Sequence, residues 1–493
     1  MDAIQGEAEH EIGEIEADYV IAGCGAVGMA FADVVLSETD AQIAIIDRHA
    51  KPGGHWNDAY PFVTLHQPSA FYGVSSTELS RGVKDQVGLN KGLFDLASGA
   101  EISAYFEQVM RERFLPSGRV RYYPMCDAQT ADLEADPRGG RTLRFQNRLS
   151  GARGVAKARR RLVDATHLKT SVPSTHNPNF RIEPGVWFAP LNDLPRIERA
   201  PAGYVVIGGG KTGIDACLWL LEQGAPAEAI RWITPRDAWL LDRRNMQPGL
   251  EFFERSMGAI ASQFEAIAAA ESVTDMFDRL EACGYLLRLD PAVRPTMFHG
   301  ATISRAELEE LRRIKQVIRL GRVQALETDR ILLDDGALPS TPDHLHIDCS
   351  ARAISNAALK PIFDGARITL QMVRPYQPVF SAGFIAHIEA AYSDEAEKNR
   401  LCGLVPLPNH DTDFIRFTAA GMMNQYHWSQ DAQLRAWLRG NRLDGFSAMI
   451  KSLAPDDHAR RALIDRMRAA APLAMGKLQE FLADIEAEGC AHG

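Results

Sequence analysis

The stretch from Ala17 to Gly28 reads ADYVIAGCGAVG, in which a short apolar run leads directly into the pattern GxGxxG. A run with helical composition follows, and a second apolar run ends at Asp47. This carboxylate lies about 20 residues beyond the glycines, which is the distance that the dinucleotide-binding fingerprint requires. The order of strand, glycine turn, helix, strand and acid predicts a βαβ unit, and therefore an α/β protein with parallel strands.

Each part of this unit has a physical task if it binds a dinucleotide. The first glycine allows a tight turn, the second lets the backbone approach a pyrophosphate, and the third lets helix and strand pack closely. The helix N-terminus offers N–H groups and a partial positive charge to the phosphates, and the acid accepts hydrogen bonds from the ribose. A glycine-rich turn without a ligand is the alternative interpretation. The predicted ligands of the first nucleotide are Gly23, Gly25, Ala26, Val27, Gly28, Asp47, Arg48 and Gly54.

A second copy of the pattern follows the expected strand Tyr204–Ile207. When the next strand is aligned with its counterpart in the first unit, Thr234 takes the place of Asp47, and Arg236 follows. A carboxylate there would repel a 2′-phosphate and a guanidinium would pair with one, so the second unit is predicted to bind NADP(H) rather than NAD. An arginine that is merely solvated is the alternative. The predicted ligands of the second nucleotide are Gly208, Gly210, Lys211, Thr212, Gly213, Thr234 and Arg236.

Composition and charge limit the classes to which the chain can belong. Its 493 residues are 46% hydrophobic, as in ordinary globular proteins, and its net charge of −10 argues against nucleic acid or an anionic membrane as main partner. No apolar run approaches the roughly 20 residues of a membrane helix. Seven cysteines without a CxxC or zinc-type cluster indicate reduced thiols in a cytoplasmic protein and no metal site. Residues 1–16 contain acids but no lysine or arginine, which predicts a mobile acidic tail rather than a signal peptide.

Two such units in one chain resemble the two-dinucleotide-binding-domain flavoproteins, in which a nicotinamide delivers hydride to a flavin. The segment Gly53–Pro61, GGHWNDAYP, is similar to the GGxW…YP stretch of the single-component FAD/NADPH monooxygenases of the flavin-containing and Baeyer–Villiger types. The resemblance implies FAD on the first unit, NADP(H) on the second, and Trp56 against the flavin ring. It further implies that one oxygen atom of dioxygen, held as a C4a-hydroperoxide of the flavin, is inserted into a small organic substrate.

The residues expected to line this reaction site are Trp56, Asn57, His66 and Gln67, with His66 as the group expected to titrate. Ser69 and Tyr72 match the Baeyer–Villiger pattern DxxSxxY, but His66 replaces its acid. The fingerprint FxGxxxHxxx(W/F) corresponds to 186–195, which keeps an aromatic residue but neither the glycine nor the histidine. The subclass of oxygenation therefore stays open.

Other activities fit the same two motifs. An NADPH-dependent flavin reductase or dehydrogenase without productive oxygen transfer is the main alternative, and a redox-sensing or partner-binding flavoprotein is a further one. A disulfide reductase would need a cysteine pair near the flavin, and no cysteine occurs between Asp47 and Cys126. The substrate and a possible homo-oligomeric state cannot be read from the sequence.

The expected architecture is two Rossmann-like dinucleotide-binding domains with a helical insertion and a helical C-terminus. Apolar residues at helical spacing between Phe252 and Ile267 indicate the insertion, and His346 is expected to mark the return to the first domain. Leu473–Ile485 is predicted to be an amphipathic helix that starts after Pro472. The predicted boundaries are 17–200 for the first part of the FAD-binding domain, 201–340 for the NADP-binding domain with its insertion at about 249–316, 341–400 for the return segment and 401–493 for the C-terminal region.

Overall fold

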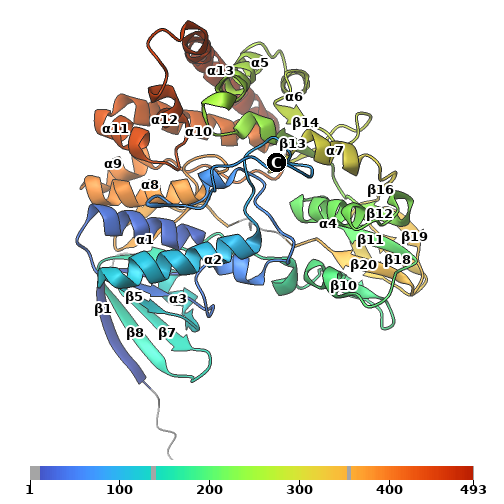
Figure 1. The fold of residues 1–493 in the computed structure, drawn as a ribbon, viewed down its shortest axis with the longest axis horizontal. Coiled ribbons are helices and arrows are strands. Elements are labelled where there is room, and N and C mark those ends of the chain that lie inside the picture. The colour runs from blue at the N-terminus through green and yellow to red at the C-terminus, as the bar shows by residue number, and fades with distance from the viewer. Residues whose placement is uncertain (1–10, 135–139, 352–356, 492–493) are drawn as a thin grey trace, which may run out of the picture.

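Two parallel β-sheets organise the chain in the computed structural model, which describes residues 11–134, 140–351 and 357–491 (Figure 1). The first sheet consists, in order, of β21 (Phe363–Asp364), β22 (Arg367–Thr369), β8 (Arg153–Asp164), β1 (Glu11–Ala22), β2 (Ile43–Ile46) and β5 (Val120–Tyr123). From β22 to β5 these strands are parallel. An antiparallel extension on β8 consists of β7 (Thr142–Asn147) and β6 (Cys126–Ala128).

The second sheet repeats the strand order of the first. Its parallel strands are β10 (Phe188–Pro190), β20 (His344–Asp348), β11 (Gly203–Ile207), β12 (Ile230–Ile233) and β16 (Gln316–Ile318). In both sheets the strand before the glycine pattern, β1 or β11, lies between the next strand of its unit and a strand from much later in the chain. This reversal places a topological switch point, where α/β sheets bind ligands, at the carboxyl end of each. The predicted α/β class with two Rossmann-like units is confirmed.

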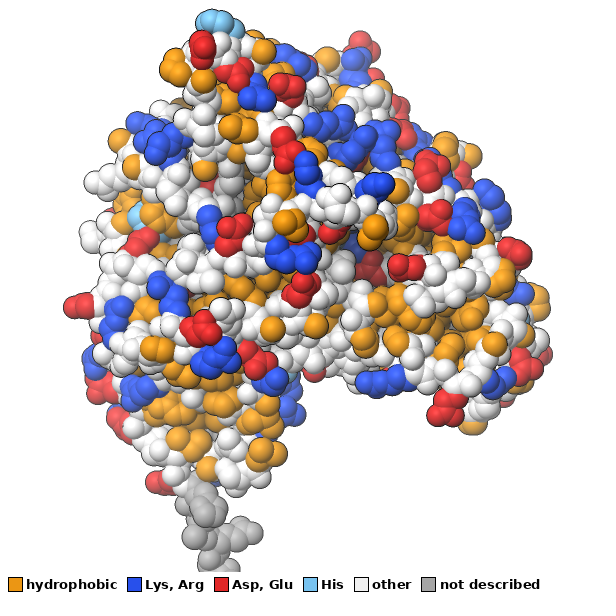
Figure 2. Space-filling view, in the orientation of Figure 1, with side chains coloured by type: hydrophobic (Ala, Val, Ile, Leu, Met, Phe, Trp, Pro, Cys, Tyr) orange, Lys and Arg blue, Asp and Glu red, His pale blue; other side chains and the backbone are white. Residues whose placement is uncertain are grey.

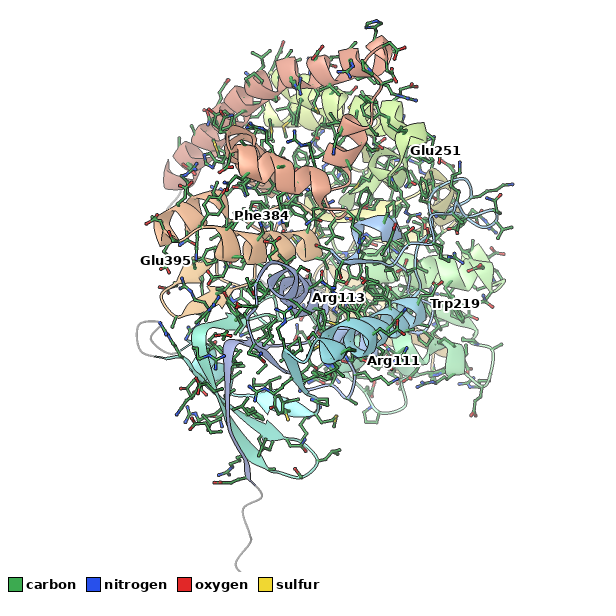
Figure 3. The ribbon with its side chains drawn as sticks, turned by 60° about the vertical axis from the view of Figure 1, so that its left-hand side comes forward. Arg111, Arg113, Trp219, Glu251, Phe384 and Glu395 are labelled. Atoms are coloured by element: carbon green, nitrogen blue, oxygen red, sulfur yellow. The ribbon has the colours of Figure 1, made fainter. Side chains whose placement is uncertain are left out.

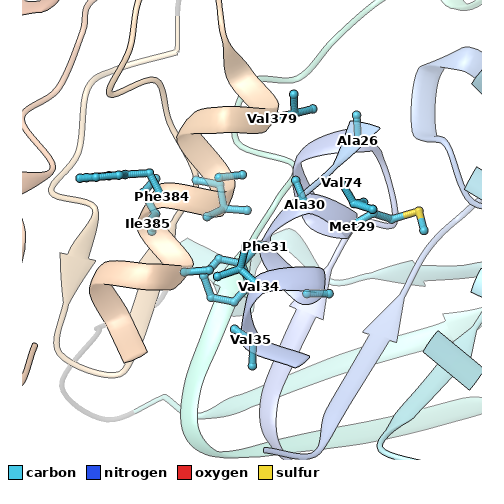
Figure 4. Packing of buried hydrophobic residues seen from close by; sticks show 14 of the residues in the cluster. Ala26, Met29, Ala30, Phe31, Val34, Val35, Val74, Val379, Phe384 and Ile385 are labelled. Carbon is cyan, nitrogen blue, oxygen red and sulfur yellow. The ribbon is translucent and has the colours of Figure 1, made fainter. Parts of the chain in front are cut away.

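Helix α1 (Ala26–Glu38) follows the first glycine loop and packs against α8 (Pro378–Ala391) (Figure 4). The apolar cluster between the two helices includes Phe31, Val34, Val379, Phe384 and Ile385. Burial of each large side chain of this kind stabilises the fold by about 1.5–3 kcal/mol. Because α8 comes from the last third of the chain, this contact joins a distant segment to the helix that follows the first glycine loop.

Short elements complete the two units. In the first unit they are β3 (Gly73–Val74), β4 (Thr77–Glu78), α2 (Gly99–Val109) and α3 (Thr130–Glu134). In the second unit they are α4 (Lys211–Glu222), after the glycine loop, and a small sheet of β9 (Arg181–Ile182), β17 (Val323–Leu326), β18 (Arg330–Leu333) and β19 (Gly336–Pro339).

The insertion in the second unit contains strands as well as helices, which corrects the prediction of a purely helical segment. A three-stranded sheet consists of β13 (Ala238–Asp242), β14 (Leu286–Leu287) and β15 (Met297–Ile303). The helices are α5 (Phe253–Ala268), α6 (Val273–Ala282) and α7 (Arg305–Leu311). The predicted apolar spacing is present in α5, where Met257 and Ile267 are buried. The strands were missed because the central β13 is buried on both faces and shows no apolar–polar alternation.

The C-terminal region is helical, as predicted. It contains α9 (Glu395–Leu401), α10 (Asp413–Gln430), α11 (Ala432–Gly440), α12 (Phe446–Lys451) and α13 (His458–Ala491). Pro472, expected to precede a helix, lies inside α13, where it removes one backbone hydrogen bond. Ala474, Leu478 and Phe481 are buried in the same cluster as Ala266 and Ile267 of α5, and this packing outweighs the loss of the hydrogen bond.

The predicted acidic tail is corrected in its second half. β1 begins at Glu11, so residues 11–16 form a strand that pairs with β8, while residues 1–10 lie outside the described residues. Glu14 pairs with Lys157 at 2.6 Å, across the strands, and Ile15 is buried. The acids that suggested a solvated tail are therefore the exposed face of a two-sided strand, matched by bases more than 140 residues away along the chain.

Strand pairing also moves two predicted domain boundaries. β9 and β10 lie within 17–200, yet they join sheets of the second unit, so the first part of the first unit ends before residue 181. His346 lies in β20, a strand of the second sheet, and the chain returns to the first sheet only at β21. Strands β8 and β20 occupy equivalent places in their sheets, which is why the end of β20 resembles a return to the first unit.

No described helix is both long and apolar enough to span a membrane. Acidic and basic side chains are intermixed over the face shown in Figure 2.

Candidate functional site

The two glycine loops have similar backbone geometries. Gly23 and Gly208 have φ values of +103° and +131°, in the left-handed region that favours glycine. A Cβ on Gly28 would lie 2.1 Å from the carbonyl oxygen of Gly23, and a Cβ on Gly213 would lie 2.0 Å from that of Gly208. The first glycine thus turns the chain, and the third lets the helix lie directly on the turn.

The middle glycines leave space where a pyrophosphate would lie. Gly25 and Gly210 are the N-cap residues of α1 and α4, and neither helix has a side-chain cap or an acid in its first turn. A Cβ on Gly210 would have no described heavy atom within 4 Å, and one on Gly25 would meet its nearest neighbour, Gly54 Cα, at 3.6 Å. By contrast, α2 and α7 are capped by Ser98 and Ser304. The uncapped N–H groups fit a dinucleotide phosphate at both loops, and the space beside Gly210 is open.

A third element, which the sequence motifs did not predict, repeats in both units. β8 ends in Asp164-Ala165-Thr166 and β20 in Asp348-Cys349-Ser350. In each, the first residue's carboxylate accepts the N–H and hydroxyl of the third, at 2.8 and 2.8 Å in the first unit and at 2.9 and 2.6 Å in the second. A Cβ on Gly23 would lie 3.0 Å from Thr166 Cγ2, and one on Gly208 would lie 2.4 Å from the Cys349 carbonyl oxygen. The repeated D-x-[S/T] at the ends of two apolar strands is the sequence signal that would have found these residues.

Cys349 directly follows β20 and therefore lies beside the second glycine loop. Its carbonyl contacts Gly208, and burial raises the pKa of its thiol well above the usual range. The thiol stays protonated and has a packing role.

Asp47 lies at the end of β2 and is buried beside the first loop. Its Oδ2 atom accepts the Cys24 N–H at 2.5 Å, and its Oδ1 atom accepts the N–H of His49 at 2.7 Å. The carboxylate is thus held against the loop where the fingerprint expects it to meet a ribose. Arg48, also predicted to bind the first nucleotide, has an exposed guanidinium that lies 3.6 Å from Asp127.

In the second unit the predicted phosphate-recognition residues lie at the end of β12. Thr234 is buried, and its hydroxyl has no hydrogen-bond partner among the described residues. The backbone of Arg236 adjoins the loop, since a Cβ on Gly209 would lie 3.4 Å from its carbonyl oxygen. Its guanidinium donates to Asn409 Oδ1 at 3.1 Å and lies 3.3 Å from His410 Nδ1. The loop before α10, which the sequence did not implicate, therefore borders this end of the site.

Lys211 and Thr212 occupy the first turn of α4. The Lys211 amine pairs with Asp215 one turn along the helix, so its charge is shared with a carboxylate. Asp215 also accepts the hydroxyl of Tyr60 at 2.6 Å.

The segment 53–63 runs from the first glycine loop to the helix that follows the second. At its start the Gly53 N–H donates to the Cys24 carbonyl at 2.9 Å, and the chain then forms a 3-10 turn over Gly54–Asp58. At its end the ring of Phe62 stacks on Trp219 of α4, with centroids 4.8 Å apart (Figure 3 labels Trp219). One short stretch of chain thus contacts both the first glycine loop and the helix after the second.

Trp56 is the predicted flavin-pocket residue on this turn. Its Nε1 donates to the Tyr72 hydroxyl at 2.7 Å, and the two rings meet edge to face at 6.0 Å. The ring is partly buried against the first unit's core. Tyr72, noted in the sequence only as part of a Baeyer–Villiger pattern, therefore orients Trp56.

The other predicted reaction-site residues are engaged in holding the fold. The exposed Asn57 donates from its amide to the carbonyls of Lys51 and Gly54, at 3.2 and 2.9 Å, and so closes its own turn. The prediction that it lines a pocket is therefore not supported by its side-chain direction. Gln67 donates to the Tyr376 carbonyl at 3.3 Å.

His66 accepts the N–H of Thr302, in β15, at its Nδ1 atom at 3.3 Å. Burial, and to a lesser degree the nearby Lys211 and Arg243, lower the pKa of His66 to about 3. It is therefore neutral over the physiological range, which corrects its expected role as the titrating group. His66 and Gln67 join the first unit to the insertion and to the loop before α8.

The fold and the loops define a protein with two dinucleotide-binding units in one chain. No protein-family model matches the sequence. The uncharacterized protein Rv2000 of Mycobacterium tuberculosis (strain ATCC 25618 / H37Rv) and the uncharacterized protein Mb2023 of Mycobacterium bovis (strain ATCC BAA-935 / AF2122/97) are each 44% identical to it over 468 residues. These alignments cover 95% of this chain and 85% of each relative. The chain belongs to the same family as these mycobacterial proteins.

Solved structures similar to the chain include a flavin monooxygenase from Stenotrophomonas maltophilia, with 14% identity, a TM-score of 0.44 and coverage of 79% of this chain and 100% of that one. A cyclohexanone monooxygenase has 13% identity, a TM-score of 0.48 and coverages of 76% and 86%. A steroid monooxygenase bound to NADP has 12% identity, a TM-score of 0.45 and coverages of 92% and 98%. All three are monooxygenases, the class that the sequence motifs resemble. The candidate site is defined by this chain's own glycine loops and sheet order.

Proposed function

We propose that this chain is an NADPH-dependent FAD monooxygenase that transfers one oxygen atom from dioxygen to a small organic substrate. The observation that carries the proposal is the repetition of a similar glycine loop at two switch points, with segment 53–63 in contact with both units. Two dinucleotides held by one chain in this way favour hydride transfer between a nicotinamide and a flavin. In this proposal FAD binds the first unit, with Asp47 at its ribose, and NADP(H) binds the second.

FAD, when bound, supplies hydride acceptance and the activation of dioxygen, as this cofactor does in other proteins. The chain's own residues bind the two nucleotides and orient the flavin. The N–H groups after Gly25 and Gly210 hold the two pyrophosphates, and Arg236 holds the 2′-phosphate. Trp56, fixed by Tyr72, excludes water from one side of the flavin.

The decisive experiment has three steps. The purified protein is expected to release FAD on denaturation, and the bound flavin is expected to bleach under nitrogen on addition of NADPH. Stopped-flow mixing of the reduced protein with oxygen should then show a transient spectrum, distinct from both reduced and oxidised flavin, before reoxidation is complete. Reoxidation in a single step, with and without NADP⁺, would instead support an NADPH-dependent flavin reductase or dehydrogenase. Absence of bleaching would support a redox-sensing or binding role.

Arg236→Ala is expected to raise KM for NADPH by about 10- to 150-fold and to leave KM for NADH nearly unchanged. A charge-assisted contact to the 2′-phosphate is worth about 1.5–3 kcal/mol, and NADH lacks this group. Steady-state reduction kinetics with both coenzymes measure the effect. The matched control is Asn409→Ala, which removes the loop partner of Arg236 but keeps the guanidinium. It should preserve the preference for NADPH, and equal losses for both coenzymes in Arg236→Ala would refute the assignment.

Trp56→Ala is expected to shorten the transient seen on reoxidation and to divert most of the oxidised NADPH to hydrogen peroxide, because water gains access to the flavin. Peroxide yield per NADPH consumed measures the diversion. Tyr72→Phe is the control that removes only the hydrogen bond to Trp56, and its yield should lie between those of the wild type and Trp56→Ala. Identical peroxide yields in all three proteins would show that Trp56 does not shield the flavin from water.

A further inference from the structure

His49 lies between two carboxylates at the edge of the first glycine loop. Its Nδ1 atom is 2.9 Å from Asp47 Oδ1, and its Nε2 atom is 2.9 Å from Asp58 Oδ2. The backbone of His49 is held as well, because its N–H donates to Asp47 and its carbonyl accepts the Met125 N–H at 3.0 Å. The ring is therefore a rigid bridge between the end of β2 and the end of the turn that carries Trp56.

The bridge requires a particular protonation state. Both ring nitrogens of a histidine donate only when the ring is the imidazolium cation, whereas a neutral ring turns a lone pair toward one of the two carboxylates. The hydrogen bond to Asp47, together with the charges of Asp47 and Asp58, raises the pKa of His49 above its usual 6.5. The nearby titratable His55, on the same turn as Asp58, has its pKa lowered to about 4 by burial and stays neutral.

Asp58 extends the bridge toward the second unit. Its carbonyl accepts the Ser174 hydroxyl at 2.6 Å and the Asn192 amide at 2.9 Å, both from the chain that leads from β8 to β11. The His49–Asp58 contact thus links the end of β2 to the end of the turn Gly54–Asp58, which is itself bonded to this connection.

The internal repeat shows which residue of the second unit corresponds to His49. Alignment of Ile43–Asp47 with 230–234 places His49 opposite Arg236. In the second unit this position carries the cation expected to meet the 2′-phosphate. In the first unit the cation faces protein carboxylates instead, and one of these is the expected ribose ligand.

We propose that His49 is a positioning residue for the flavin, which as an imidazolium holds Asp47 against the glycine loop and ties it through Asp58 to the turn of Trp56. The proposal rests on FAD binding to the first unit. Because the bridge is complete only while His49 is protonated, it is fully present below pH 6.5 and is lost as the pH rises through the raised pKa of His49. Affinity for FAD falls over the same range.

Titration of the apoprotein with FAD between pH 6 and pH 9, followed by flavin fluorescence, tests this. In the wild type Kd is expected to rise about tenfold with pH, since one charge-assisted hydrogen bond is lost. His49→Asn cannot titrate and cannot span both carboxylates, so its Kd should be raised already at pH 6 and should not change with pH. His387→Asn removes a histidine–carboxylate pair elsewhere, with Glu38, and should retain the wild-type profile.

Asp58→Asn provides an independent readout that a merely structural role would not give. The amide of an asparagine donates to the lone pair of a neutral ring, so the bridge forms without the second proton. FAD affinity in Asp58→Asn should therefore be retained at pH 9, where that of the wild type has fallen. A wild-type Kd that does not depend on pH, or the same pH profile in His49→Asn, would overturn the proposal.

The thermal unfolding of the apoprotein tests the bridge independently of the proposal that FAD binds the first unit. The difference in Tm between the wild type and His49→Asn should shrink as the pH rises from 6 to 9. If that difference is seen but FAD does not bind at any pH, the flavin assignment fails and the bridge stands. If Tm differs by the same amount at every pH, the bridge itself is refuted.

Discussion

Gly25→Ala and Gly210→Ala are expected to abolish the binding of different nucleotides while leaving the protein folded. Both residues have extended backbones that alanine adopts freely, with φ of −76° and −84°. The added methyl group meets no described atom within 4 Å at Gly210 and only an ordinary contact at Gly25. It would instead occupy the space of the pyrophosphate. Loss of two charge-assisted hydrogen bonds costs about 3–6 kcal/mol, or roughly 10²- to 10⁴-fold in affinity.

The two substitutions are distinguished by simple observations. Gly25→Ala should purify colourless, while Gly210→Ala should stay yellow and resist bleaching by NADPH. Gly258→Ala in α5, where the new methyl group meets nothing within 4 Å, is a control that should leave both properties intact. Gly28→Ala is the opposite control, because its methyl group would lie 2.1 Å from a backbone oxygen and should reduce the yield of folded protein. Exchanged phenotypes for the first two variants would show that the order of the sites is reversed.

Glu307→Ala is expected to lower the free energy of unfolding by about 3–5 kcal/mol, the usual cost of leaving a buried charge without its partner. Arg243 is 1% exposed and donates to both carboxylate oxygens of Glu307, at 3.1 and 2.8 Å. It also donates to the carbonyl of His66 and to Asn90 of the first unit. Glu307 in turn accepts the Ser304 N–H at 2.6 Å as part of a capping box. Urea denaturation followed by circular dichroism measures the loss.

Glu310→Ala on the same helix is the matched control. Glu310 of α7 pairs with Arg313, just beyond the end of the helix, and both side chains are at least one-third exposed. A surface pair of this kind contributes about 0–1 kcal/mol, so its removal should have little effect. Equal losses in the two variants would show that α7 is sensitive to any substitution and that the buried pair has no special weight.

Much of the fold follows from local patterns. The strands and helices around Gly23–Gly28 and Gly208–Gly213 lie within a few residues of their predicted places, because strand, turn and helix there are set by consecutive residues. Predictions failed where the deciding partner is distant in sequence. The acids of 11–16 were assigned to a tail because the bases that pair with them, Lys157 and Arg159 of the neighbouring strand β8, lie far along the chain. β20 was assigned to the first unit because nothing in its own five residues states which sheet it joins.

The candidate site divides in the same way. The glycines, Asp47 and Arg236 could be read from the sequence because a phosphate loop and its acid form one short βαβ unit with fixed spacing. The partners of Trp56, His66 and Asn57 could not be read, and neither could the repeat of Asp164–Thr166 at 348–350, whose place beside the glycines depends on the crossover of strands.

The sequence by itself thus determined that two Rossmann-like units with glycine loops are present, since that information is carried by residues in direct succession. Only the tertiary structure decided that segment 53–63 contacts both units, that His66 is a neutral structural residue, and that His49 bridges Asp47 and Asp58. These features arise when hydrophobic burial, which has no direction of its own, brings distant segments together, and hydrogen bonds then select the side chains that meet.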